Sequence, residues 1–343
     1  MFSSLPLAAL MGIFAAAALV ILLCGTRLTN LADRLADRTG FGEALVGGVL
    51  LGAATSLSGT IVSLTAALDG RASLAFSNGI GGIAAQTAFL AVADTVYRRA
   101  NLEHAAAELA NVFQGALLML LLALPVAAFT APEVAIAGIH PVSILLLAIY
   151  AGGVVASNRV RQEPMWKPVN TGETSPDEPD EEEESRRNTV ILLATFAGLM
   201  LLMGVAGWAI AKVASVLTDR YGLSASLVGA LMTAVVTSLP ELVTTLAAVR
   251  RGALQLAVGG IIGGNTFDTL FLTISDAGYR DGSIYHALQK ADYFWLTTGM
   301  IMTAILVLGQ LYRQKEGPAN IGLESAGILG VYAVAILVQG VFM

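Results

Sequence analysis

Long apolar segments recur along the whole chain, and they constrain the fold more than any other feature. A helix needs about 20 apolar residues to cross a bilayer, and ten segments reach or approach that length. They are Leu5–Leu23, Ala44–Leu68, Ser73–Val96, Ala105–Phe129, Val142–Val155, Val190–Val216, Leu223–Val249, Ala253–Ile274, Tyr293–Leu311 and Ile321–Phe342. Only 13% of the residues are charged, against about a quarter in a soluble protein. We therefore predict an all-α polytopic membrane protein with ten transmembrane helices.

The positions of the basic residues predict how the chain is oriented. Positive side chains are retained on the cytoplasmic side of a membrane. With the N-terminus outside, 14 of the 19 Lys and Arg residues fall in the cytoplasmic connections and the other 5 fall on the opposite side. We expect a plasma (inner) membrane protein with both termini external.

An acidic connection divides the chain into two groups of five spans. Residues 159–187 contain "TSPDEPDEEEESRR", which is rich in proline and carboxylates and has no apolar periodicity. Such a composition is typical of a disordered linker, here on the cytoplasmic side; an ion-sensing regulatory loop is the alternative. The linker separates a first half, residues 1–158, from a second half, residues 188–343.

The two halves contain a repeat. Residues 42–94 align with residues 224–276 without a gap, at a constant offset of 182 residues. The matched pairs include Thr55/Thr237, Ser56/Ser238, Leu57/Leu239, Gly70/Gly252, Gly81/Gly263, Gly82/Gly264, Thr87/Thr269 and Asp94/Asp276. Five spans separate the copies, so they cross the membrane in opposite directions. Inverted repeats are typical of secondary transporters, whose substrate binds at the repeat interface near mid-membrane. Asp94 and Asp276 lie near span ends, where we expect them to be interfacial anchors or helix-end partners.

The second repeat contains polar residues in an apolar segment, "TSLPELVTT" at 237–245. Pro240 interrupts helical hydrogen bonding, and a bare carboxylate such as Glu241 is costly in hydrocarbon unless it is paired, protonated or coordinating. Thr237, Ser238 and Glu241 are spaced to share one helical face. The spacing predicts a polar patch that holds a ligand.

A second polar patch follows in "GGIIGGNTFD", where Asn265 and Asp268 are three residues apart. Together with Glu241, these residues offer carboxylate, amide and hydroxyl oxygens, which suit hard cations such as Ca²⁺, Na⁺ or Mg²⁺. The sequence has no cluster of His or Cys of the kind that binds zinc or copper.

These two motifs resemble the α-repeats of the calcium/cation antiporter superfamily, which includes the Na⁺/Ca²⁺ and H⁺/Ca²⁺ exchangers. The resemblance covers both repeats and the ten-span layout, and it implies a sodium/calcium exchanger-like fold. It implies that Glu241 and Asp268 line the ion site and hold the metal ion, with Thr237 and Ser238 as additional ligands. The transported cation is then the ligand, and no other cofactor is expected.

The first repeat departs from the family pattern. "TSLSG" at 55–59 replaces "TSLPE", so Gly59 stands where the family has a second glutamate, and Gln86 stands where it has an acid or an asparagine. A Ser-Gly pair can still bend a helix, and Gln86 still offers an amide oxygen. We therefore add Thr55, Ser56 and Gln86 to the candidate cation-binding residues, with a site charge of at most −2.

Three functions are compatible with this asymmetry. The protein is expected to exchange Ca²⁺ or a related divalent cation for Na⁺ or H⁺ by alternating access. It could instead exchange a monovalent cation, Na⁺ or K⁺, for H⁺, or be a non-exchanging channel-like or ion-sensing protein on the same scaffold. The sequence has no nucleophile constellation and an acidic soluble segment, which argues against an enzyme and against nucleic-acid binding. The expected partners are inorganic cations and the lipid bilayer; the sequence does not indicate an oligomeric state.

Overall fold

Helices make up most of the structure, a computed structural model that describes residues 2–39, 52–97, 100–169, 189–315, 317 and 321–342. The long helices are α1 (Leu7–Thr39), α4 (Ala72–Val96), α6 (Leu109–Thr130), α7 (Pro141–Gln162), α8 (Thr189–Tyr221), α14 (Lys290–Tyr312) and α15 (Leu323–Phe342). The shorter elements, which include the π-helical η2 and the 3-10 helical η3, are α3 (Leu57–Leu68), α5 (Leu102–Ala105), α9 (Ala225–Leu227), η2 (Val228–Thr233), α10 (Ala234–Thr237), α11 (Leu239–Arg251), α12 (Leu254–Asp268), α13 (Leu270–Gly278) and η3 (Ile284–His286).

The helix lengths confirm a polytopic membrane protein. Among the described residues, eight helices are long and apolar enough to cross a bilayer when α12 and α13 are counted as one span. Elements α9 to α11 add a ninth span, which is bent by 46° at its break. The apolar helix α3 has only 12 residues and begins just after residues 40–51, which lie outside the described parts. These elements are consistent with the ten predicted spans.

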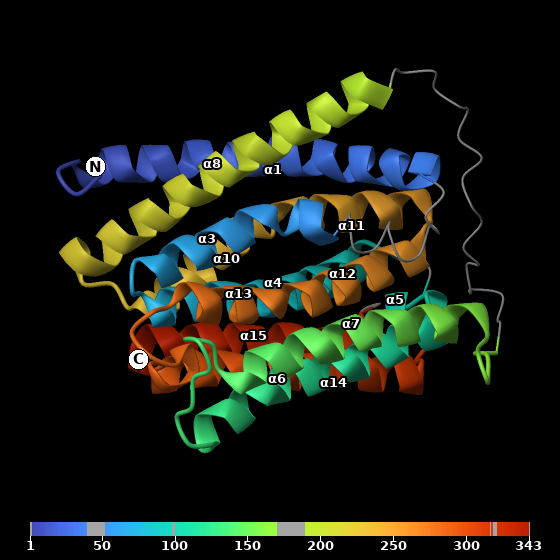
Figure 1. Ribbon diagram of the computed structural model, residues 1–343. Coiled ribbons are helices and arrows are strands. Elements are labelled where there is room, and N and C mark those ends of the chain that lie inside the picture. Colours follow the sequence, from blue (N-terminus) through green and yellow to red (C-terminus); the bar gives the residue numbers. More distant parts are fainter. Residues whose placement is uncertain are drawn as a thin grey trace.

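The two halves are arranged as an inverted pair (Figure 1). The start of α1 and the end of α15 lie at one end of the bundle, and the end of α7 and the start of α8 lie at the other end. The first long helix of each half, α1 and α8 respectively, pack against one another on one flank. Helices α3, α4 and α10 to α13, which belong to the two repeats, lie between that flank and a layer formed by α6, α7, α14 and α15.

Helix α4 runs through the centre of the bundle, and most of it is buried. Its small residues let other backbones come close. A Cβ atom added at Gly81 would lie 2.3 Å from the Cα atom of Ala230 in η2, so only glycine fits there. This close crossing brings the middle of the first repeat against the start of the bent span of the second repeat.

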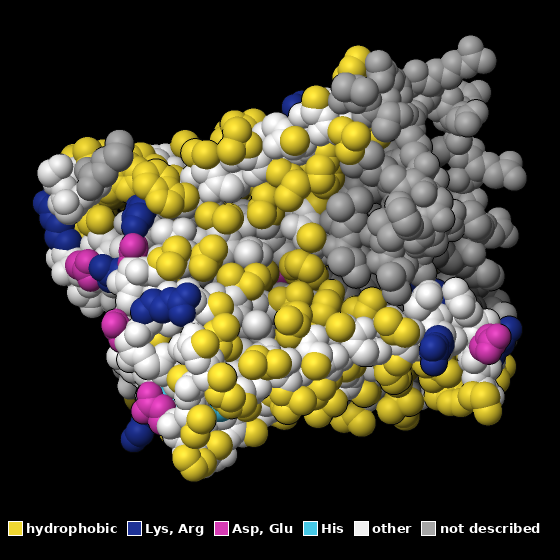
Figure 2. Space-filling model, in the orientation of Figure 1, with side chains coloured by type: hydrophobic (Ala, Val, Ile, Leu, Met, Phe, Trp, Pro, Cys, Tyr) yellow, Lys and Arg dark blue, Asp and Glu magenta, His cyan; other side chains and the backbone are white. Residues whose placement is uncertain are grey.

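The surface shows where a bilayer would contact the protein (Figure 2). Hydrophobic side chains cover the flanks of the helices, and Lys, Arg, Asp and Glu gather at the two ends. Large apolar side chains are exposed along the flanks, for example Leu201 at 70% and Leu308 and Leu337 at 63% each. Helix α7 continues to Gln162, so the linker predicted at 159–187 begins after that residue; residues 170–188 lie outside the described parts.

Candidate cation-binding site

The bent span of the second repeat carries the first group of site residues. Helix α10 ends at Thr237 and α11 begins at Leu239, with Ser238 between them. Pro240 lies in the first turn of α11, where a missing N–H group costs no helical hydrogen bond. The sequence placed this proline inside a helix, whereas the structure shows that it starts a new one. A Cβ atom at Gly25 would lie 2.4 Å from Pro240 Cγ, so α1 packs directly over the break.

A closed polar pocket lies where this break meets the first repeat. Its lining residues come from both repeats and are Ser56, Gly59, Asn78, Gly82, Gln86, Thr237, Ser238, Glu241, Asp268 and Phe271. The side chains pack so closely that no water-sized sphere fits among them. Both carboxylates are buried, with Glu241 6% and Asp268 2% exposed. The pocket thus places two acidic groups together away from solvent.

Asp268 is held by donors from the first repeat. The Ser56 hydroxyl donates to Oδ1 at 2.5 Å, and the Gln86 amide donates to Oδ2 at 2.7 Å. The same Gln86 amide reaches Ser238 Oγ at 3.3 Å. Gln86 and Asp268 occupy equivalent positions in the two repeats, and so do Ser56 and Ser238. The four residues therefore form a network that is symmetric in position but not in charge.

Glu241 is less fully satisfied than Asp268. The Thr55 hydroxyl hydrogen-bonds its carboxylate, but its Oε2 atom is buried without a partner. The Gln86 Oε1 atom is also buried without a partner. Unpaired buried oxygens are costly, and a cation bound beside Glu241 would satisfy its free oxygen.

The place of the missing second glutamate is filled by an aromatic ring. A Cβ atom at Gly59 would lie 2.7 Å from Cε2 and 3.0 Å from Cζ of Phe271, and 3.6 Å from the Thr237 hydroxyl. Gly59 therefore faces the pocket, as the repeat predicts, but Phe271 occupies the space next to it. This half of the pocket holds no charged side chain.

Two predicted site residues, Asn265 and Thr55, do not line the pocket, although Thr55 contacts the Glu241 carboxylate. Asn265 was expected to share a helical face with Asp268, but its amide donates to Thr87 Oγ1 at 3.0 Å and it does not line the pocket. Thr237 lines the pocket while its hydroxyl donates to the Ala234 carbonyl at 3.2 Å.

Asn78 also lines the pocket, a role that the sequence alone leaves open. Its amide donates to the Gly59 carbonyl at 3.0 Å and to Ser63 Oγ at 2.9 Å, and its oxygen accepts from Thr233 at 2.7 Å. Asn78 therefore fixes α4 to α3 and to the bent span. The signal for this role is an amide in an otherwise apolar stretch, "FSNGIGG".

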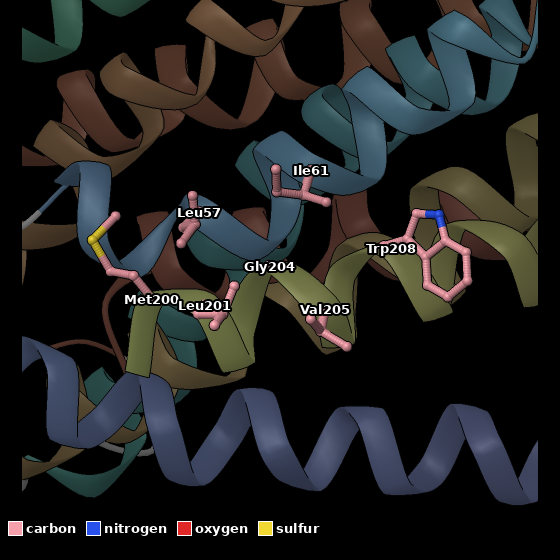
Figure 3. Close-up of a pocket in the computed structure, with 7 residues that line it drawn as sticks. All are labelled: Leu57, Ile61, Met200, Leu201, Gly204, Val205 and Trp208. Atoms are coloured by element: carbon pink, nitrogen blue, oxygen red, sulfur yellow. The ribbon is translucent and has the colours of Figure 1, made fainter. Parts of the chain in front are cut away.

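A larger groove on the outside of the bundle has a different character. It has a volume of about 480 Å³ and is lined by Leu57, Ile61, Met200, Leu201, Gly204, Val205 and Trp208 (Figure 3). These residues come from α3 and α8 and offer no carboxylate. Within the described part of the chain, no three His, Cys, Asp or Glu side chains form a ready-made metal site. Cation binding would thus depend on Glu241 and Asp268 with neutral oxygens.

Comparisons with known proteins agree with this architecture. The family described as sodium/calcium exchanger protein matches residues 9–157 and 191–341. The inner membrane protein YrbG of Escherichia coli (strain K12) is 31% identical over 121 residues, which cover 35% of this chain and 36% of YrbG. The chain thus matches about a third of that relative's length.

Solved structures of exchangers share the fold at low sequence identity. The sodium-calcium exchanger NCX_Mj superposes with a TM-score of 0.61 at 17% identity, covering 96% of this chain and 98% of NCX_Mj. The H⁺/Ca²⁺ exchanger CAX gives a TM-score of 0.64 at 13% identity, covering 96% and 86%. A structure of native YfkE gives 0.60 at 13% identity, covering 95% and 91%.

Proposed function

The chain belongs to the sodium/calcium exchanger family of cation antiporters, and from this premise we propose that it exchanges Ca²⁺ or a related divalent cation for Na⁺ or H⁺ by alternating access. The observation that carries the proposal is the pairing of Glu241 and Asp268 in one closed pocket between the repeats. Two carboxylates neutralise one divalent cation, which removes most of the cost of moving it through hydrocarbon. Two protons or Na⁺ ions discharge the same two groups on the return step.

The neutral groups of the pocket support a hard cation. The hydroxyls of Ser56 and Ser238 line the pocket together with the carboxylates, and Gln86 carries an unpaired amide oxygen. Ca²⁺ takes several oxygen ligands from carboxylates, amides and other oxygens. Because Phe271 fills the first-repeat side of the pocket, the charged ligands lie nearer the second repeat, and we place one cation there, off-centre.

Exchange of a monovalent cation for H⁺ is the second candidate. It is favoured by the hydrogen bonds that already occupy both oxygens of Asp268, from Ser56 and Gln86. Glu241 is then the one carboxylate of the pocket with an unpaired oxygen. A single negative charge matches one Na⁺ or K⁺, or one proton.

Transport by reconstituted vesicles tests both proposals. Uptake of Ca²⁺, Mg²⁺, Na⁺ and K⁺ is measured under an imposed Na⁺ gradient and, separately, under an H⁺ gradient. Divalent uptake that depends on either gradient supports the first proposal, and monovalent uptake coupled only to H⁺ supports the second. Flux that is independent of both gradients contradicts the two proposals together.

A matched pair of variants links the flux to the pocket. Asp268→Asn removes one site charge at nearly constant volume, and it is expected to abolish divalent uptake. Lys212→Gln removes a charge from an exposed ion pair with Asp69, so it changes a surface charge without touching the pocket. If both variants lose uptake equally, the loss in Asp268→Asn cannot be attributed to the pocket.

We also propose that the protein lies in the plasma (inner) membrane, with both termini external and the linker that follows Gln162 cytoplasmic. The excess of basic residues at the linker end of the bundle supports this orientation. Alkaline phosphatase fused after residue 343 would be active outside the cell if the orientation is correct. If the phosphatase fusion is inactive and a fluorescent protein fused at the same position is fluorescent, then the C-terminus is cytoplasmic and the proposed orientation is wrong.

A further inference from the structure

Two aspartates close the opposite ends of the bundle in equivalent ways. At the end that carries the linker, Asp94 accepts hydrogen bonds from the backbone N–H groups of Leu102 at 2.7 Å and Gly322 at 3.0 Å. We call these three residues the Asp94 clasp. It ties the end of α4 to the turn α5 and to the start of α15, which belongs to the other half.

The equivalent Asp276 clasp lies at the end that carries the termini. Asp276 accepts from the backbone N–H groups of His140 at 2.7 Å and Ile284 at 3.4 Å. Each of its three residues is 182 positions from its counterpart in the Asp94 clasp. Asp94 and Asp276, which were predicted to be helix-end partners, thus each accept two backbone N–H bonds in equivalent ways at opposite ends of the bundle.

Neutral hydroxyls pack beside the Asp276 clasp. Tyr285 and Ser143 are hydrogen-bonded to one another at 2.8 Å, and Ser143 donates to Asp276 at 2.7 Å. Tyr285 is fully buried. All three polar side chains therefore have partners, and only the aspartate carries an ionisable carboxyl group.

Carboxyl groups take the same place beside the Asp94 clasp. Glu103 is the repeat equivalent of Tyr285; it is 1% exposed, and neither of its carboxylate oxygens has a hydrogen-bond partner. The carboxyl group of Glu324, in the first turn of α15, lies next to it. Glu324 is 6% exposed, and its Oε1 atom also lacks a partner. Two buried carboxyl groups thus face each other with unused oxygens.

No cation of the described residues neutralises this pair. None of the three ion pairs in the described parts includes Glu103 or Glu324. The neighbouring Arg313 donates to the His104 and Val169 carbonyls, and the His104 ring nitrogen contacts the Arg313 carbonyl at 2.8 Å. Lys315 has a partner of its own, and its carbonyl accepts from Asn101.

The surroundings favour a protonated pair. Burial, together with the charges of Asp94 and Glu324, raises the pKa of Glu103 well above its usual range. Two carboxylates sharing a buried site cannot both be ionised without a large cost. A proton between them would supply the hydrogen bond that their oxygens lack.

We propose that Glu103 and Glu324 form a proton-binding site, separate from the cation pocket, that controls the Asp94 clasp. When the pair holds one proton, the two side chains attract and α5 stays against the start of α15. When the proton leaves, two negative charges repel one another directly beside the N–H groups of Leu102 and Gly322. The clasp then opens, and the connections at the linker end of the bundle loosen.

The sign of the pH dependence follows from this arrangement. A carboxyl group that keeps its proton in the folded protein binds more protons there than in the unfolded chain. Its stabilising effect is complete at acid pH and is lost as the pH rises through the folded-state pKa. The clasp is therefore closed at low pH and opens as the linker side becomes alkaline.

Infrared difference spectroscopy of the full-length protein tests the site directly. Spectra of the wild type minus Glu103→Gln, and of the wild type minus Glu324→Gln, are recorded at neutral pH. The difference for Glu103→Gln is expected to contain the C=O band of a protonated carboxyl group, which should disappear as the pH is raised, and Glu324→Gln is expected to alter that band because it removes the neighbour of Glu103. Differences that contain only bands of ionised carboxylates would overturn the proposal. The two variants serve as alternatives if one of them does not fold.

Thermal unfolding tests the effect on the clasp. The unfolding midpoint of the wild type is expected to fall as the pH rises above about 4.3, the ordinary pKa of a glutamate, and Glu103→Gln should remove part of that fall because its amide donates permanently. Tyr285→Phe changes the equivalent position of the other clasp and should keep the wild-type pH dependence. Glu103→Gln should also keep cation uptake at neutral pH, since it lies outside the pocket. A wild-type pH dependence in Glu103→Gln would contradict the role of this pair.

Discussion

Restoring the second glutamate of the site, with Gly59→Glu, is the perturbation with the most specific outcome. The new Cβ atom would lie 2.7 Å and 3.0 Å from two ring atoms of Phe271, so the ring has to move. Overpacking of a tight site costs about 1–3 kcal/mol. That cost corresponds to a fall of roughly 5- to 150-fold in the ratio of folded to unfolded protein, at tenfold for each 1.4 kcal/mol. Gly59→Ala is the matched control, because it adds the Cβ atom without the charge.

Combining Gly59→Glu with Phe271→Ala, which removes the ring, should distinguish the effect of packing on stability from the effect of charge on transport. Phe271→Ala alone creates a cavity, at a cost of about 3–5 kcal/mol. In the double variant the glutamate fills part of that cavity, so the double variant should be more stable than the sum of the single changes, by more than the roughly 0.5 kcal/mol expected of independent sites. The site would then carry three carboxylates, and transport should gain a dependence on one further Na⁺ or H⁺, or stall.

Unfolding midpoints, together with uptake measured against pH and Na⁺, decide the outcome. We expect Gly59→Glu to be less stable than Gly59→Ala, and the double variant to have a changed dependence of uptake on Na⁺ or pH. If Gly59→Glu is as stable as the wild type and its uptake profiles coincide with it, then Gly59 does not face the ion. The proposed pseudo-symmetric site would then be wrong.

Three other substitutions test the pocket and its frame. Glu241→Gln should fold normally but lose divalent uptake, because it keeps the volume and removes a charge; uptake at the wild-type rate would exclude Glu241 from the site. Gln86→Ala removes a hydrogen bond to the Asp268 carboxylate, so it should lower the free energy of unfolding by about 1.5–3 kcal/mol without added cation, measured by denaturation with and without Ca²⁺. Gly81→Val should prevent accumulation of folded protein, since its side chain would overlap the Ala230 backbone; a normal yield of monodisperse protein would show that this crossing can relax.

Much of the candidate site could be predicted because its polar residues stand out in apolar segments. Glu241 and Asp268 have no structural reason to lie in hydrocarbon, and the constant repeat offset placed Ser56 and Gln86 opposite them. These residues do meet in one pocket. The fold class followed from the lengths of the apolar segments, which depend on bilayer thickness and not on detailed packing.

The remaining features depend on how each helix is rotated about its own axis, which the spacing of residues along the sequence does not determine. Asn265 and Asp268 are on one side of α12, yet small differences in direction send Asn265 to Thr87 and Asp268 to the pocket. The ring of Phe271 lies beyond the end of α12, on the separate helix α13, so its contact with Gly59 has no sequence signal. The π-helical turn η2 adds a further change of rotation in the bent span.

The hydrogen bond between Gln86 and Asp268 joins positions that the pseudo-twofold axis exchanges. If the two halves swap conformations during transport, this bond maps onto itself, while the bonds Ser56–Asp268 and Gln86–Ser238 exchange places. The centre of the network can therefore act as a stationary pivot while the helix ends move. Asp268 is an acid and Gln86 is an amide, so the two conformations of the transporter differ in free energy. Without bound cation, the protein should therefore populate mainly one of these conformations.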